Sequence, residues 1–186
     1  LEFFSDQKTT AFRLINGEGD GIPGLIADRY SDAVSMQIYT RALEPYVKQI
    51  VTEIRKLLPE IKWIYKRDNI RISKTGSAEL IYGKNMPDKI EFYENGLKFS
   101  TDLVNGQKTG FFLDQRTNRH LIRTISKNKS VLNLCGYTGA FTVAAAAGKA
   151  SSSLTVDISK PALEEAKKNI EQNGFSTNKH KILSAD

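Results

Sequence analysis

The residues whose types and spacing suggest chemistry lie in one stretch, Leu132–Asp157, which reads LNLCGYTGAFTVAAAAGKASSSLTVD. Within it, Gly136 and Gly139 flank Tyr137 and Thr138, after an apolar run and before an alanine-rich run. The alanine-rich run favours a helix. The first amides of a helix are unpaired and carry a partial positive charge, which suits an anion. The stretch therefore predicts an anion-binding turn that joins a strand to a helix.

The spacing of the glycines indicates which anion would fit. A dinucleotide turn follows G-x-G-x-x-G, because bare positions let the backbone approach a pyrophosphate, but here Tyr137 occupies such a position. The carboxylate of an amino-acid moiety needs less room, and S-adenosylmethionine carries one together with an adenosine. Asp157 ends the next predicted strand, 18 residues after Gly139, where a carboxylate can accept hydrogen bonds from ribose hydroxyls. A helix-capping role for Asp157 and a packing role for Gly139 are the alternatives.

Further polar residues fall close to the same turn. Asp186 ends a third predicted strand, where its carboxylate could accept a hydrogen bond from an adenine amino group. Asn133 is expected to brace the turn. Cys135 is expected to be a small, buried strand residue rather than a nucleophile, because no histidine lies near it in the sequence.

Alternating helices and strands in the second half of the chain would position this turn. A helix over 112–126 is expected to bury Leu113, Leu121, Ile122 and Ile125. Strands are predicted at 130–135, 152–157 and 180–186, with helices between them at 138–149 and 159–174. This order predicts a parallel sheet flanked by helices, with the candidate residues at the carboxyl ends of its strands.

The first half predicts a different arrangement, with strands around one helix. The strands are expected at 12–15, 25–30, 34–39 and 61–67, and the helix at Leu43–Leu58. Residues 68–88 are predicted to be a loop or short edge strands. Asn95-Gly96 separates two β-rich runs and favours a type I′ hairpin turn.

Composition narrows the class of protein. The 186 residues are 40% hydrophobic and 26% charged, with one cysteine and no apolar run long enough to span a bilayer. These features predict a globular protein of a reducing, cytoplasmic compartment without a disulfide framework. The net charge of +6 lies entirely in residues 96–186, which hold 13 Lys and Arg against 7 Asp and Glu. Such an excess fits either a polyanion-binding surface or a solvated face.

Three motifs together resemble one protein family. They are VLNLCGYTGAFTVAAAAGKASSSLTVDIS at 131–159, KTGFFLDQR at 108–116 and NGEGDGIPGLIADRY at 16–30. Over nearly the whole chain they are similar to the bacterial ribosomal RNA large-subunit methyltransferases. The similarity is greatest to members that methylate carbon 5 of a cytosine in 23S rRNA, and members that make 7-methylguanosine share these motifs.

The resemblance implies a fold, a cofactor and a partner. The fold class would be α/β, with a small α+β (β-β-α-β-β) domain over 1–93. Residues 94–186 would form the first half of a Rossmann-like class I methyltransferase domain, truncated at the third parallel strand. The family's RNA-binding PUA domain is absent from these residues, and we expect the natural protein to continue beyond Asp186. The implied cofactor is S-adenosylmethionine and the implied partner is 23S ribosomal RNA.

The resemblance also implies individual site residues. Tyr137–Gly139 match the loop under the methionine part, and Asp157 matches the acid that binds ribose. Arg116 would pair with the cofactor carboxylate and Phe111 would exclude water, with a solvated helix face as the alternative for Arg116. Together with the residues predicted above, the candidate cofactor-binding residues are Lys108, Thr109, Phe111, Asp114, Arg116, Asn133, Cys135, Tyr137, Thr138, Gly139, Asp157, Ser159 and Asp186.

One part of the family pattern is missing from the chain. Carbon 5 of cytosine is a poor nucleophile, so a cysteine thiolate must first add to carbon 6, and in the family that cysteine follows the third strand. No catalytic residue is therefore assigned, and no metal site is expected. By themselves, these 186 residues are expected to bind weakly and not to turn over.

Other functions remain open at this point. Methylation of guanine N7 and a non-catalytic RNA-binding adaptor are the alternatives within RNA biology. An oxidoreductase with a nicotinamide cofactor is a third, which the missing glycines disfavour. The oligomeric state is open, with a homodimer as one option.

Overall fold

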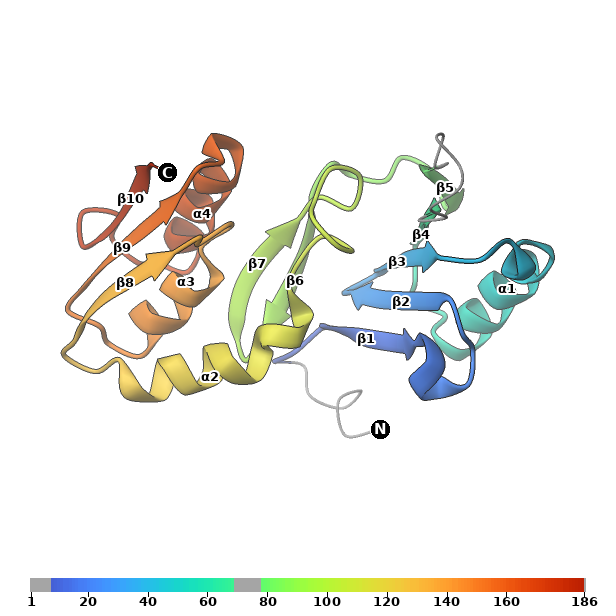
Figure 1. Ribbon diagram of the computed structural model, residues 1–186, viewed down its shortest axis with the longest axis horizontal. Coiled ribbons are helices and arrows are strands. Elements are labelled where there is room, and N and C mark those ends of the chain that lie inside the picture. Colours follow the sequence, from blue (N-terminus) through green and yellow to red (C-terminus); the bar gives the residue numbers. More distant parts are fainter. Residues whose placement is uncertain (1–7, 69–77, 186) are drawn as a thin grey trace. The chain divides into compact units, whose positions relative to one another are not determined.

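Figure 1 shows the computed structural model of the chain, which describes residues 8–68 and 78–185. The chain forms two compact units. The first comprises Leu1–Phe92 and Ser100–Leu113, and the second comprises Tyr93–Phe99 and Asp114–Asp186. Residues 100–113 thus group with the first unit, although the sequence placed them in the second domain. Among the described residues, no helix is long and apolar enough to cross a membrane.

A five-stranded sheet in the order β1-β2-β3-β4-β5 forms the first unit. Its strands are β1 Ala11–Asn16, β2 Leu25–Tyr30, β3 Ala33–Ile38, β4 Trp63–Asp68 and β5 Ala78–Tyr82. The β3–β4 pair is parallel and the other three pairs are antiparallel. Helix α1 (Val47–Leu57) connects the parallel pair, as such a crossover requires. The first four strands lie within two residues of their predicted ranges, and β5 is the edge strand that the sequence left open between 68 and 88.

The apolar face of this sheet is covered by α1. Leu25 and Met36 are fully buried in the same core cluster as Ile54 of α1. The regular helix starts four residues later than the predicted Leu43, because Arg41–Tyr46 forms a 3-10 turn that contains a proline. The apolar stripe of the predicted helix nevertheless packs on the strands.

The opposite face of the sheet is polar and holds the segment 102–112. The Arg67 guanidinium donates to four backbone carbonyls, those of Leu103, Val104, Gly106 and Lys108. Gln37 Nε2 donates to the carbonyl of Lys108 at 2.7 Å. These bonds account for the grouping of residues 100–113 with the first unit.

Strands β6 (Ile90–Glu94) and β7 (Leu97–Thr101) form a hairpin. Its turn residues Asn95 and Gly96 have φ angles of 51° and 77°. Two positive φ angles in succession define a type I′ turn. The hairpin turn predicted from the Asn-Gly dipeptide is therefore confirmed.

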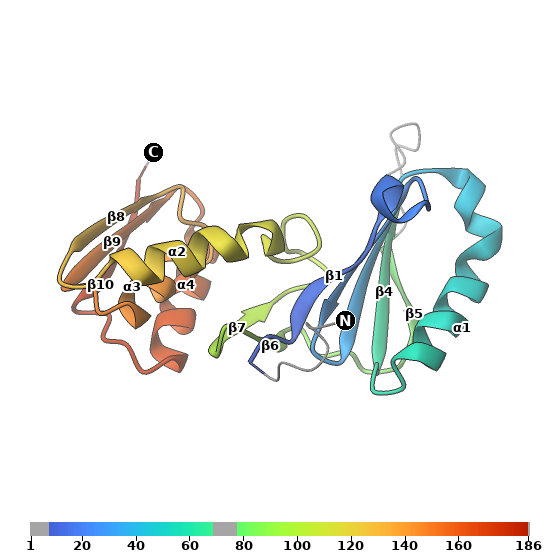
Figure 2. The same ribbon diagram turned by 90° about the horizontal axis from the view of Figure 1, so that it is seen from below.

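A parallel three-stranded sheet in the order β10-β9-β8 forms the centre of the second unit. Its strands are β8 Ser130–Leu134, β9 Ser152–Asp157 and β10 His180–Ser184. Helices α3 (Ala140–Ala147) and α4 (Lys160–Gln172) pack on one face and against each other (Figure 2). The predicted α/β order and parallel pairing are confirmed. On the opposite face, Leu132 and Leu134 are 61% and 62% exposed, so the described residues cover one face only.

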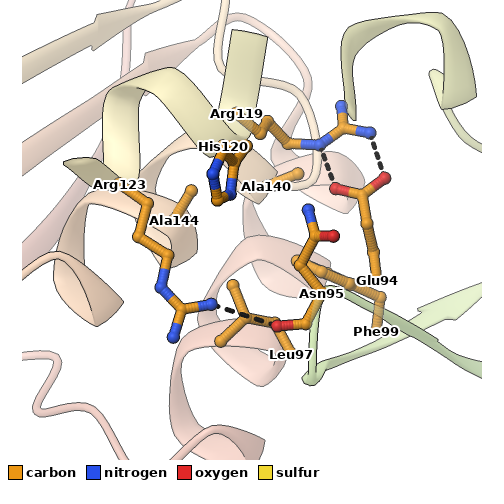
Figure 3. A pocket seen from close by; sticks show the side chains of 9 residues that line it. All are labelled: Glu94, Asn95, Leu97, Phe99, Arg119, His120, Arg123, Ala140 and Ala144. Carbon is orange, nitrogen blue, oxygen red and sulfur yellow. Dashed lines mark hydrogen bonds and ion pairs between the residues drawn. The ribbon is translucent and has the colours of Figure 1, made fainter. Parts of the chain in front are cut away.

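Helix α2 (Arg116–Ile125) packs against α3, but with a different side inward from the one predicted. Leu121 and Ile125 are 55% and 51% exposed, whereas Arg119 is 2% exposed. Figure 3 shows the cause: Arg119 faces Glu94 of the hairpin, with two guanidinium-to-carboxylate distances of 2.6 Å. A buried charge requires such a partner. The prediction that Leu121 and Ile125 are buried was wrong because the ionic pair sets the helix face.

Candidate cofactor-binding site

The turn between β8 and α3 folds tightly against the end of β9. The Gly136 amide donates to the Val156 carbonyl at 3.0 Å, and the Gly139 amide donates to the Gly136 carbonyl at 2.9 Å. Cys135, Tyr137 and Gly139 have φ angles of 52°, 47° and 73°. The left-handed region costs a residue with a side chain about 1–2 kcal/mol. The backbone bonds thus hold the turn in one defined, strained conformation.

The Asp157 carboxylate lies directly against this turn. Its Oδ2 accepts from the Tyr137 amide at 2.8 Å, and its Oδ1 accepts from the Ser159 amide at 2.9 Å. A carboxylate has about four acceptor positions, so two bonds leave about one position on each oxygen. The side chain is half-buried rather than enclosed. Two acceptor positions at a partly open strand end match the two hydroxyls of a ribose.

The start of α3 provides donors beside that carboxylate. The Val143 amide makes a helical bond to the Gly139 carbonyl at 3.0 Å. The amides of Ala140, Phe141 and Thr142 precede it and have no partner within the helix. They carry the partial positive charge of a helix N-terminus. A carboxylate on an adenosyl ligand fits this end of the turn chemically.

Close packing is a second reason for glycine at both positions of the turn. A Cβ on Gly139 would lie 2.7 Å from Cβ of Ala166 in α4, and one on Gly136 would lie 2.4 Å from Cγ2 of Thr155 in β9. The Thr138 carbonyl accepts from Nδ2 of Asn169 at 2.9 Å. Asn169 is fully buried on α4 and was missed in the sequence. The sequence feature that could have identified Asn169 is a polar residue among the apolar residues on the buried side of an amphipathic helix.

Hydrogen bonds between three polar side chains connect β8, α3 and β9 next to the turn. Asn133 Nδ2 donates to Thr142 Oγ1 at 3.1 Å, and the hydroxyls of Thr142 and Thr155 are 2.5 Å apart. Asn133 therefore contacts the helix that follows the turn, as a bracing residue would. Cys135 is exposed, so the expectation that it is buried was wrong. The strand ends at Leu134, and the left-handed backbone at Cys135 leads the chain out of the sheet.

Thr109 and Phe111, two of the candidate cofactor-binding residues, lie in the interior of the first unit. Thr109 Oγ1 donates to Asp28 at 2.5 Å and is 2.9 Å from the Tyr30 hydroxyl, which accepts from the Phe111 amide at 3.2 Å. Burial raises the pKa of Tyr30 above its ordinary value, so this hydroxyl stays protonated. The rings of Phe111 and Phe92 meet edge to face, with centroids 5.0 Å apart.

The remaining candidates of that segment divide between the units. Lys108 lies in the first unit with φ 53°, and its Nζ is 4.4 Å from the Phe112 ring centroid. Asp114 and Arg116 lie in the second unit, where Asp114 is exposed and Arg116 begins α2. Asp186 lies outside the described residues. Within the second unit, the structure thus brings seven candidates to the strand ends: Asn133, Cys135, Tyr137, Thr138, Gly139, Asp157 and Ser159.

The hollow drawn in Figure 3 is not an alternative ligand site. It lies between the hairpin and α2, with Asn95, Leu97, His120 and Arg123 in its lining. Its volume of about 10 Å³ is room for about one water molecule. We therefore assign no ligand to it.

Known proteins resemble this chain in sequence and in structure. Residues 64–186 match the family model described as S-adenosylmethionine-dependent methyltransferase. A protein of Aliivibrio fischeri named ribosomal RNA large subunit methyltransferase I is 38% identical, over 95% of this chain and 46% of its own length. A Deinococcus radiodurans protein named ribosomal RNA large subunit methyltransferase is 37% identical, over 100% of this chain and 46% of its own length. The chain therefore spans about half the length of the relatives it matches.

A solved structure shares the fold. The crystal structure of SMU.776 complexed with SAH superposes on the whole chain with a TM-score of 0.89. It is 32% identical in sequence, and 48% of its chain is covered. The similarity thus extends over both units of the chain described here.

Proposed function

Because this chain belongs to the S-adenosylmethionine-dependent methyltransferase family, we propose that the natural protein transfers a methyl group from that donor to a base of ribosomal RNA. The names of the relatives from Aliivibrio fischeri and Deinococcus radiodurans support the RNA substrate. The Asp157 carboxylate, held against the turn with acceptor positions to spare, is the observation that most supports the donor site.

In this proposal, each part of the site binds one part of the donor. Asp157 accepts from the ribose hydroxyls, and the amides at the start of α3 bind the amino-acid carboxylate. Tyr137, Thr138 and Gly139 form the floor of the methionine pocket. Bound S-adenosylmethionine supplies a methyl group on a cationic sulfonium. The protein's own residues fix its orientation toward the acceptor.

The segment 108–116 and Asp186 complete the proposed donor site. We propose Lys108, Thr109, Phe111, Asp114 and Arg116 as further donor-binding residues. The support is the motif KTGFFLDQR together with the bonds that give its first residues a fixed backbone. Asp186 is proposed to accept from the adenine amino group.

We further propose carbon 5 of a cytosine in 23S rRNA as the methylated atom. That reaction requires a thiolate to add to carbon 6 before carbon 5 can attack the methyl group. No residue of the described part of the chain is assigned this role. A base inside an RNA helix would have to leave its stack before it could reach the donor.

Calorimetry on the natural protein that carries this chain would test the donor site. S-adenosylhomocysteine should bind and NADH should not. Mass spectrometry of 23S rRNA from cells without the gene should then show one 5-methylcytosine missing. Loss of a 7-methylguanosine instead would replace the proposed base, and binding of NADH alone would refute the methyltransferase proposal.

A further inference from the structure

The excess positive charge of this protein is concentrated in one run of sequence. Residues 115–156 contain six Lys and Arg and no Asp or Glu. The rest of the chain balances, with 21 basic and 21 acidic residues, so this run accounts for the entire net charge of +6. An uninterrupted run of one sign is a candidate for binding the opposite sign.

The structure separates the six cations into two groups. Arg119 is neutralised by Glu94, and Arg116 begins α2 beside the proposed donor segment. The other four cations come from the end of α2, the start of β8 and the turn after α3. We call them the basic corner: Arg123, Lys127, Lys129 and Lys149.

Backbone contacts gather these four residues at one place. The Asn128 amide, between two of the lysines, donates to the Lys149 carbonyl at 3.0 Å. The Ser151 amide donates to the Lys129 carbonyl at 2.9 Å. A Cβ on Gly148 would lie 2.1 Å from the Arg123 carbonyl oxygen, so the two backbones are in direct contact. The corner is therefore a fixed feature of the second unit.

The side chains of the corner are available to a ligand. Lys127, Lys129 and Lys149 are exposed. Arg123 is half-buried, and its guanidinium donates to the Asn95 carbonyl at 3.0 Å (Figure 3). That bond uses one of about five donors and fixes the direction of the side chain.

The partial negative charges at helix C-termini neutralise only part of the positive charge of the basic corner. Helices α2 and α3 both end at the corner, and each C-terminus carries about half a negative charge. Together they offset about one of the four cations. Lys149 also has φ 64°, in the left-handed region where glycine would be less strained. A net surplus of positive charge remains that the fold itself does not require.

We propose that the basic corner binds phosphates of the RNA backbone, an inference that rests on the proposed RNA substrate. The corner lies at the amino ends of the strands, whereas Asp157 lies at their carboxyl ends. Five residues of β8 separate these edges, which is about 16 Å at 3.3 Å per residue. The corner therefore holds RNA away from the base that reacts, and contributes affinity and orientation rather than chemistry.

Two triple variants of the natural protein test this surface at equal charge. The first is Lys127→Gln/Lys129→Gln/Lys149→Asn, where asparagine suits the left-handed position. The matched control removes three exposed lysines of α4: Lys160→Gln/Lys167→Gln/Lys168→Gln. The probe is a fluorescein-labelled single-stranded RNA of mixed sequence, titrated by anisotropy over a series of KCl concentrations. S-adenosylhomocysteine binding is measured in parallel by calorimetry.

The corner variant should bind RNA about 10- to 100-fold more weakly, with a salt slope smaller by about 2, at about 0.7 per phosphate for single strands. The control should change affinity less than about twofold, since α4 is not part of the surface. Both variants should retain S-adenosylhomocysteine binding. Equal losses in both triples, or no loss in either, would overturn the proposal. Competition by polyglutamate as effective as by unlabelled RNA would also overturn it, in favour of an acidic protein partner.

The readouts separate this inference from the proposed function. RNA binding that depends on the corner in a protein that binds no S-adenosylhomocysteine would support the corner and refute the donor site. If instead S-adenosylhomocysteine binds normally and the corner variant binds RNA as well as the unchanged protein does, the donor site is supported and the proposal for the basic corner is refuted.

Discussion

Removal of the Asp157 carboxylate should weaken donor binding through the ribose. The change is Asp157→Ala in the natural protein, with Glu164→Ala on the exposed face of α4 as the matched control. A hydrogen bond to a charged group contributes about 1.5–3 kcal/mol. One such bond corresponds to about 10- to 150-fold in affinity, so loss of both ribose bonds should weaken binding by at least that much.

The difficulty is that Asp157 also holds the turn, through the amides of Tyr137 and Ser159. A simple loss of affinity would not distinguish contact with the ribose from loosening of the turn. The assay is therefore a cycle, in which calorimetry compares S-adenosylhomocysteine with its 2′-deoxyribose analogue on both proteins.

In the unchanged protein, the missing hydroxyl should weaken binding about 10-fold or more, because the charged acceptor loses its donor. In Asp157→Ala, the same change of ligand should have less than about a twofold effect, since the acceptor is already absent. The Glu164→Ala control should behave as the unchanged protein. An equal penalty for the missing hydroxyl in all three proteins would refute the reasoning.

Three further predictions concern stability. Arg119→Met should lower the free energy of unfolding by about 3–5 kcal/mol in a urea titration, because it leaves Glu94 buried and unpaired. Adding Glu94→Gln should recover part of the lost stability. No recovery would contradict the view that the unpaired Glu94 carboxylate causes the loss. Gly139→Ala should cost about 1–3 kcal/mol by overpacking against Ala166, seen as a lower melting temperature; an unchanged melting temperature would count against the close packing. Burial lowers the pKa of His180, so its neutral form is favoured when folded. Its contribution to stability should be complete above pH about 6.5 and should decline as the pH falls toward the lower folded pKa. In His180→Gln this pH-dependent contribution should be absent. An identical pH dependence of stability in both proteins would contradict the prediction.

Features fixed by neighbouring residues were predictable from the sequence. The Asn95-Gly96 turn is one, because the dipeptide itself favours two positive φ angles. The parallel order of β8, β9 and β10 is another, since a helix after β8 and another after β9 return the chain to the edge where the next strand begins. The position of Asp157 at the end of β9 follows from the same pattern.

Features fixed by distant partners were not predictable. The inward face of α2 depends on Glu94, which is 25 residues from Arg119 in the chain. Periodicity alone favoured Leu121 and Ile125 because it does not register a buried ion pair. Likewise, no residue near Thr109 in the sequence indicated that its hydroxyl donates to Asp28, which is 81 residues away.

The exposure of Cys135 also escaped prediction, for a local reason. Its place after an apolar run suggested one more buried strand residue. The strand instead ends at Leu134, and a left-handed φ of 52° turns the cysteine outward. Such a conformation is uncommon for a residue with a side chain, so the sequence offers no signal for it.

The central claim, that the Asp157 edge of the second unit binds an adenosyl donor, is tested most directly by a crystal structure of the natural protein with S-adenosylhomocysteine. In that structure, both ribose hydroxyls should lie within about 2.5–3.0 Å of the Asp157 carboxylate, and the ligand carboxylate should lie at the first amides of α3. Ligand density elsewhere, or an Asp157 that contacts only the Tyr137 and Ser159 amides while the donor is bound, would contradict it.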